Sequence, residues 1–84
     1  MNKDQIAEIL IEIGVLLELK GENPFKSRAY AAAVRSLESL SEPLEKLIGE
    51  NRLGEVKGIG EAIQKKIIEL ATSGKLPYYE ELKA

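Results

Sequence analysis

Apolar residues recur at intervals of three and four along most of the chain, which is the spacing of one face of an α-helix. In the first segment this face consists of Ile6, Ile9, Leu10, Ile13, Leu16 and Leu17. Asn2 can cap the helix, with Gln5 as its capping-box partner, and Gly21 stands where a helix C-terminus favours glycine. The pattern predicts a helix over about residues 3–20.

Two apolar residues of this segment, Ile11 and Val15, fall outside the stripe. Single apolar residues are common on protein surfaces and need no functional explanation. The alternative is that both contact another domain. The segment is also acidic, since Glu8, Glu12 and Glu18 belong to it, and this favours a protein-interaction or structural module as an alternative function.

Asn23-Pro24 marks the start of a second helix, because asparagine caps helices and proline is tolerated in the first turn. The spacing predicts a helix over about residues 24–40 with a narrow inward face. Its small side chains allow a neighbouring helix to approach closely. The inward face consists of Ala29, Ala33, Leu37 and Leu40, and the small residues are Ala29, Ala31, Ala32 and Ala33.

The rest of the chain reads as shorter helices joined by tight connections. Pro43 ends the second helix, Asn51 is expected to cap a turn through Leu53 and Val56, and Gly74 closes the last long helix. Helices are expected at about residues 43–49 and 60–73, a hairpin at 56–60, and a short turn at 77–82. No segment alternates as a strand does. The prediction is an all-α protein, a compact bundle of four main helices.

The composition limits the chemistry. At 84 residues with 44% apolar residues, the chain is one domain with a small core, residues 1–84. It has no cysteine and no histidine, which excludes disulfides, Cys-type zinc sites, and Ser-His or Cys-His catalysis. Asp4 is the only aspartate, so no cluster exists for two-metal nucleotidyl transfer. Lysine remains as a nucleophile.

Charge is distributed unevenly along the chain. The net charge is −2, which is unusual for a nucleic-acid-binding protein. Residues 1–25 carry five acids and two bases, whereas residues 52–75 carry five bases and three acids. We therefore expect weak DNA binding. No apolar run can span a membrane and no signal peptide opens the chain, so we expect a monomeric, cytoplasmic protein that associates with the nucleoid.

The chemistry-bearing segment is Val56-Lys57-Gly58-Ile59-Gly60, between a short and a long helix. Both glycines can take a positive φ, and Ile59 can anchor the turn in the core. The amides near Gly60 to Ala62 then face outward, and free amides at a helix N-terminus bind anions such as a phosphate. The alternative is an ordinary helix–helix turn that contains two glycines. The neighbouring cations, Lys57, Lys65 and Lys66, favour phosphate binding.

The same residues, with Ile63 and Ile67 behind them, resemble the helix-hairpin-helix motif of DNA repair proteins. Residues 21–30 and 72–82 extend the resemblance to the N-terminal domain of family X DNA polymerases, the polymerase β lyase-like domain. The bacterial and archaeal branch is most similar, and the match covers nearly all 84 residues in order. It implies that the chain is either a fragment or a stand-alone copy of a longer polymerase.

The resemblance implies binding to the 5′-phosphate side of DNA gaps and nicks in base excision repair, without base specificity. It also implies a monovalent cation, Na⁺ or K⁺, between a DNA phosphate and the carbonyls of Gly54, Val56 and Ile59, and no other cofactor. Gln64 departs from the family, which usually has alanine there. This longer side chain either splays the two helices or turns to solvent. The expected DNA-binding residues are Lys26, Arg28, Tyr30, Lys57, Gly58, Ile59, Gly60, Ala62 and Lys65.

In polymerase β and its relatives the domain is also a 5′-deoxyribose-phosphate lyase, in which a lysine amine forms a Schiff base with the sugar aldehyde. The resemblance assigns this role to Lys66, with Lys26 and Tyr30 as pocket residues. Two phosphate-binding lysines of polymerase β correspond to Ala62 and Gly54 here, which puts the lyase activity in question. The sequence does not show whether Arg28 or Arg35 compensates for them.

Overall fold

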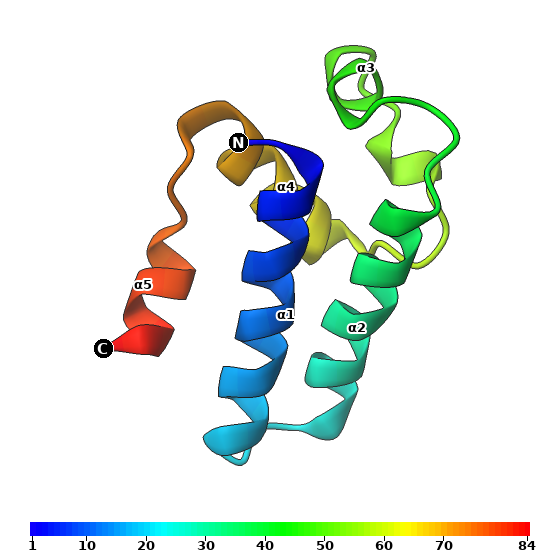
Figure 1. Ribbon diagram of the computed structural model, residues 1–84. Helices are drawn as coiled ribbons and strands as arrows, with labels where there is room; N and C mark the ends of the chain where they lie inside the picture. The colour runs from blue at the N-terminus through cyan, green and yellow to red at the C-terminus, as the bar shows by residue number, and fades with distance from the viewer.

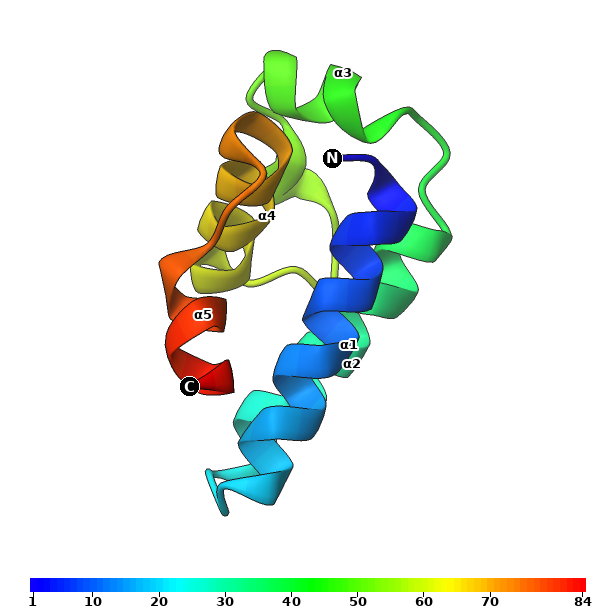
Figure 2. The same ribbon diagram turned by 60° about the vertical axis from the view of Figure 1, so that its left-hand side comes forward.

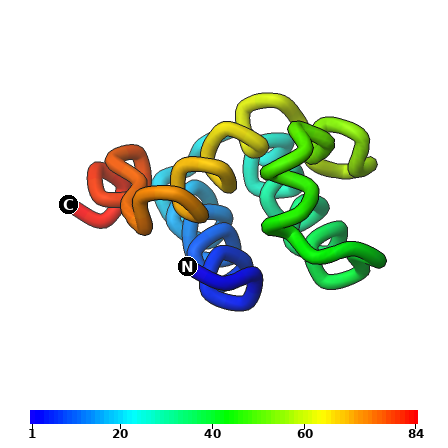
Figure 3. The backbone as a smooth tube through the Cα atoms, turned by 90° about the horizontal axis from the view of Figure 1, so that it is seen from above, coloured from blue at the N-terminus to red at the C-terminus, as the bar shows by residue number.

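Five α-helices and one short 3₁₀ turn form the chain in the computed structural model, which describes residues 1–84. Seen from above, α3 and the hairpin lie on one side of the molecule and α5 lies on the other (Figure 3). The chain is an all-α bundle, as the sequence predicts. The elements are α1 (Lys3–Leu19), α2 (Pro24–Glu38), α3 (Leu44–Gly49), the 3₁₀ turn (Leu53–Glu55), α4 (Glu61–Ser73) and α5 (Pro77–Lys83).

The first two helices run antiparallel, side by side (Figure 1). Asn2 and Gln5 form the expected capping box at the start of α1. Gly21 ends α1 at φ +74°, where the Glu22 amide donates to the Leu17 carbonyl. The Asn23 side chain then caps α2 through the Phe25 amide at 2.9 Å. These local signals set the tight connection between the two helices.

The core lies between the α1–α2 pair and α4. Ala33 and Leu37 of α2 are buried as expected, but Ala29 is exposed, and Tyr30 and Val34 are buried instead. The inward face of α2 is thus rotated by about one residue from the predicted one. The alanines alone do not define a face, because Ala31 and Ala32 lie on other sides of the helix. The core comprises Ile6, Ala7, Leu10, Ile13, Leu17, Tyr30, Ala33, Val34, Leu37, Leu44, Leu53, Ile59, Ile63, Ile67, Leu70 and Leu76.

The helix α3 ends differently from the prediction. Asn51 takes φ +56°, and its own amide and that of Arg52 return to carbonyls of α3. Asn51 therefore closes α3 as a left-handed residue and does not cap the following 3₁₀ turn, which has no side-chain cap. Asparagine serves either end of a helix because its short polar side chain tolerates the left-handed region.

The C-terminal helix α5 lies against α1 on the same side as α4 (Figure 2). The Tyr79 hydroxyl donates to a Glu12 carboxylate oxygen. This hydrogen bond is the main cause, ahead of burial and the neighbouring carboxylates, that raises the pKa of Tyr79 from its ordinary value of 10.0 to about 12. Residues at the two ends of the chain are thereby joined.

The outer surface of α1 carries several apolar residues. Ile11 and Val15 are both about half exposed, as their position outside the stripe predicts, and Leu19 of the same helix is also exposed. No helix combines the length and the apolar character that crossing a membrane would need.

Candidate nucleic-acid interface

The hairpin between the 3₁₀ turn and α4 contains two glycines with different backbones. Gly58 takes φ +90°, in the left-handed region. Gly60 takes φ −72° and ψ 164°, which any residue can adopt. Both glycines can take a positive φ, but only Gly58 does so. Between them Ile59 is 5% exposed and anchors the hairpin in the core.

Helix α2 supports the hairpin from behind. The Ser36 hydroxyl donates to the Lys57 carbonyl at 2.6 Å. A Cβ on Gly58 would overlap the Ser36 oxygen and lie 3.5 Å from the Ala32 carbonyl oxygen. Two features therefore require glycine at position 58: the positive φ of the backbone and the close approach of α2. The small residues of α2 indicate in the sequence that another segment comes close to this helix. The sequence does not show that this segment is the hairpin.

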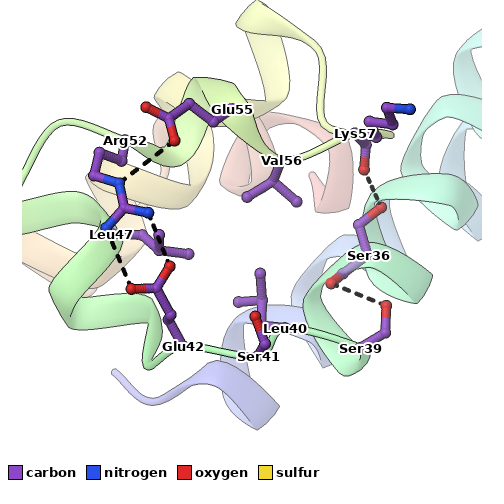
Figure 4. A pocket seen from close by; sticks show the side chains of 10 residues that line it. All are labelled: Ser36, Ser39, Leu40, Ser41, Glu42, Leu47, Arg52, Glu55, Val56 and Lys57. Carbon is purple, nitrogen blue, oxygen red and sulfur yellow. Dashed lines mark hydrogen bonds and ion pairs between the residues drawn. The ribbon is translucent and has the colours of Figure 1, made fainter.

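A pocket of about 340 Å³ lies on this supporting side, between the end of α2, α3 and the hairpin (Figure 4). The Lys57 carbonyl faces Ser36 there, whereas its side chain turns away from the pocket (Figure 4). Across the pocket, Arg52 donates to Glu42 at 2.9 Å and to Glu50 at 2.8 Å.

Glu55 is a third carboxylate partner of Arg52, at 3.4 Å. The Arg52 guanidinium is therefore surrounded by carboxylates on this side. These hydrogen bonds raise the pKa of Arg52 above its ordinary value, and the Arg52 hydrogen bond is the largest cause that lowers the pKa of Glu42. Of the bases in residues 52–75, Arg52 thus contributes little net positive charge. Lys57, Lys66 and Lys75 have no carboxylate within 4.0 Å.

The opposite side of the hairpin presents free backbone donors. None of the amides from Gly58 to Ile63 donates to a protein acceptor, and the first bond of α4 runs from the Gln64 amide to the Gly60 carbonyl at 2.9 Å. No side chain caps α4 at Gly60, and a Cβ there would meet no atom within 4 Å. The positive end of the α4 dipole therefore opens onto unobstructed space, which is a favourable place for an anion.

Lysine side chains surround these amides. Lys57 is exposed before the turn, and Lys65 is 78% exposed on the first turns of α4. Lys65 is only 3.9 Å from Glu61, a weak surface pair. Lys66 is half-buried. Lysines thus flank the free amide donors along the chain, a combination suited to a phosphate.

A second pocket, of about 470 Å³, begins beside Gly60 and brings together Lys66, Lys26 and Tyr30. The resemblance implies Lys26 and Tyr30 as pocket residues beside Lys66, and in the fold the three side chains line one space. The Lys66 ammonium lies 4.6 Å from the centre of the Tyr78 ring. Lys26 pairs with Glu22 at 3.2 Å. The complete lining is Lys26, Ala29, Tyr30, Gly60, Glu61, Ala62, Ile63, Lys66 and Tyr78.

Two aromatic residues shape this pocket. Tyr30 is 6% exposed, and burial, followed by the neighbouring Tyr78, raises its pKa above the ordinary value. Tyr78 was not among the expected site residues, although it lies in the C-terminal stretch that carries the resemblance. Arg28 does not line the pocket. Its guanidinium lies 5.6 Å from the centre of the Phe25 ring.

Gln64 is half-buried and does not turn fully to solvent. Its Nε2 donates to the Ile59 carbonyl at 3.3 Å, and its amide group lies beside Gly54. The carbonyls of Gly54 and Val56 accept no hydrogen bond within the protein. Among the three carbonyls expected to hold a cation, only that of Ile59 therefore has an internal donor.

Comparison with known proteins agrees with this geometry. A family model described as a helix-hairpin-helix domain matches residues 1–76. The chain is 34% identical over 82 residues to "DNA polymerase/3'-5' exonuclease PolX" of Bacillus subtilis (strain 168), a family X polymerase, in its N-terminal region. That alignment covers 98% of this chain but only 14% of the relative. The similarity therefore concerns one small part of a much longer protein.

Proposed function

The chain belongs to the helix-hairpin-helix domain family, and on that basis we propose that it binds DNA through a backbone phosphate. The phosphate oxygens accept hydrogen bonds from the free amides at the start of α4, beside Gly60. Lys57 and Lys65 contribute positive charge around them. Contacts of this kind reach the DNA backbone and not the base edges, so binding is independent of sequence.

The observation that carries this proposal is the uncapped start of α4. Serine or aspartate at the cap position of a helix bonds to one of the first amides, which stabilises a protein by about 0.5–2 kcal/mol relative to alanine and by a few tenths relative to glycine. Gly60 has no side chain to form that bond, although its backbone conformation and the open space around it would allow one. An external acceptor explains why the amides are free and the space is open.

We further propose that the preferred DNA is a gap or nick with a 5′-phosphate. The pocket around Lys66 and Lys26 begins at Gly60, next to the amides, so a strand held at the hairpin can extend its terminal phosphate into the pocket. Similarity to part of a polymerase supports a role as the DNA-gap module of a longer chain in repair.

Titration of ¹⁵N-labelled protein with gapped DNA tests the proposal. We expect shift changes at the amides from Gly58 to Ile63, with small changes on α3. Removing the 5′-phosphate should weaken binding and relieve the changes at Lys66. The logarithm of the affinity should fall with the logarithm of salt concentration by about 0.9 per phosphate neutralised. A flat salt response, or unmoved hairpin amides, would contradict phosphate binding.

A second candidate function, 5′-deoxyribose-phosphate lyase, is favoured by the convergence of Lys66, Lys26 and Tyr30 on one pocket. The Lys66 amine would attack the C1′ aldehyde, and water would leave to form the Schiff base. Water then takes a C2′ proton, the C3′–O bond breaks, and the downstream strand leaves with its 5′-phosphate. Hydrolysis of the remaining Schiff base frees the Lys66 amine and releases the sugar. The pocket offers space for the sugar and Lys26 for its phosphate.

Borohydride trapping on incised abasic DNA tests this activity, because reduction fixes the Schiff base as a stable adduct. Lys66→Ala should abolish the adduct. Lys75→Ala is the control, since Lys75 is an exposed lysine that lies outside the 470 Å³ pocket. An adduct that survives in Lys66→Ala, or none in the unmodified protein, would exclude Lys66 as the nucleophile.

A further inference from the structure

Gln64 and Gly54 meet across the hairpin. A Cβ on Gly54 would lie 3.3 Å from Gln64 Oε1 and 3.5 Å from Nε2. A side chain at position 54 would therefore pack tightly against the Gln64 amide, which would have to shift slightly. The same amide reaches the Ile59 carbonyl at 3.3 Å. One side chain thus connects the residue before the hairpin with the residue between its two glycines.

This contact bears on the monovalent cation that the resemblance implies. Such a cation would need the carbonyl oxygens of Gly54, Val56 and Ile59 as a free set of ligands. In this chain an N–H already points at the Ile59 oxygen, and the amide lies against Gly54. The positive end of an N–H and a cation are attracted to the same oxygen, so the three carbonyls do not fit the cation as an open site.

We propose that Gln64 replaces the cation. Its Nε2 carries two N–H donors: one holds the Ile59 carbonyl, and the other remains for an oxygen of the bound phosphate. The hairpin then binds DNA equally well whichever monovalent cation is present. This inference rests on the proposed phosphate binding at the hairpin and assigns Gln64 a direct part in it.

The first test compares affinity for a 5′-phosphorylated gapped duplex in KCl, NaCl and N-methylglucamine chloride at equal ionic strength. Fluorescence anisotropy should give dissociation constants within about twofold of one another, because counterion release depends on the phosphates neutralised. A loss of more than about fivefold in N-methylglucamine would overturn the proposal, since it would reveal a required small cation.

Two variants separate the amide from the bulk of the side chain. Gln64→Met keeps similar length but has no donor, and should bind about two- to tenfold more weakly in all three salts, the effect of one lost hydrogen bond. Gln64→Ala uncovers the Ile59 oxygen and should bind more tightly in KCl than in N-methylglucamine. Unchanged binding by Gln64→Met would refute the assigned role. Circular dichroism checks that both variants remain helical.

A readout without DNA distinguishes failure of this inference from failure of the proposed function. We expect the Ile59 carbonyl ¹³C shift of the unmodified protein to be insensitive to K⁺, and that of Gln64→Ala to respond to it. A K⁺-dependent shift in the unmodified protein would overturn the replacement even if no DNA binds. Absence of DNA binding in every salt would instead contradict phosphate binding at the hairpin.

Discussion

The two glycines of the hairpin are two residues apart, yet their surroundings are opposite. Gly58 faces inward to α2, takes a positive φ and has no room for a Cβ beside Ser36. Gly60 faces outward, has an ordinary φ and borders empty space. The fold requires the first glycine, and nothing in the fold requires the second. The same residue type therefore serves stability at one end of the hairpin and, we propose, DNA binding at the other.

This comparison also explains how an acidic domain can bind an anion. On the inner side, Arg52 is neutralised by Glu42, Glu50 and Glu55, so its charge supports the structure. On the outer side the donors are backbone amides, which carry no formal charge and do not appear in a net-charge count. Fixed dipoles at a helix start act locally, within about one turn. Net charge is consequently a poor guide to this interface.

The largest expected effect comes from filling the inner position. Gly58→Ala should lower the free energy of unfolding by about 2–4 kcal/mol, through positive-φ strain and overlap with Ser36. Gly60→Ala is the matched control and should change it by less than about 1 kcal/mol. Urea denaturation measures both. Equal losses of stability in the two variants would remove the distinction between the two ends.

The second-largest effect is expected from a charged side chain at the outer glycine, which should raise stability and lower DNA affinity. Gly60→Asp should raise the free energy of unfolding by about 0.5–1 kcal/mol, since aspartate caps α4 better than glycine. The same side chain captures an amide and repels phosphate, so DNA affinity should fall at least about tenfold.

Gly60→Ser separates the two causes of that loss, because serine captures the amide without adding charge. We expect intermediate binding, measured by anisotropy, with thermal unfolding monitored in parallel. Undiminished affinity in Gly60→Asp would show that the phosphate binds elsewhere.

The contact that joins the hairpin to α2 should have a smaller effect. Ser36→Ala removes the hydrogen bond to the Lys57 carbonyl and should destabilise the protein by about 1 kcal/mol. DNA affinity should fall less than in the Gly60 variants, because the outer amides remain free. A loss of affinity as large as that of Gly60→Asp would mean that α2 and not the helix start determines binding.

The smallest effect is expected far from both ends of the hairpin. Tyr79→Phe removes the bond to Glu12 and should lower stability by less than about 1 kcal/mol, with DNA affinity unchanged. The raised pKa predicts that this contribution is present below pH 10.0 and is lost as the pH rises toward about 12. Alkaline unfolding of the two proteins should therefore converge. A difference that grows with pH would contradict the assignment.

Local signals in the sequence predicted much of the secondary structure. Asn2, Asn23 and Gly74 act at helix ends as their chemistry requires, since caps depend only on neighbouring residues. The predicted cap at Asn51 is wrong because asparagine fits both ends of a helix, and here it ends α3. The predicted inward face of α2 is wrong by about one residue, because alanine has too little apolar surface to indicate which side of a helix is buried.

By itself the sequence determined the all-α fold, the position of the hairpin and its family, because helical spacing, caps and the motif are local patterns. Only the tertiary structure decided what each residue of the motif faces. It brought Ser36 to Gly58, Gln64 to Gly54, and Tyr78 to Lys66. These pairs come from different elements, and helix packing sets their distances. Two departures from the family that look independent along the chain, Gly54 and Gln64, therefore turn out to be neighbours that fit each other.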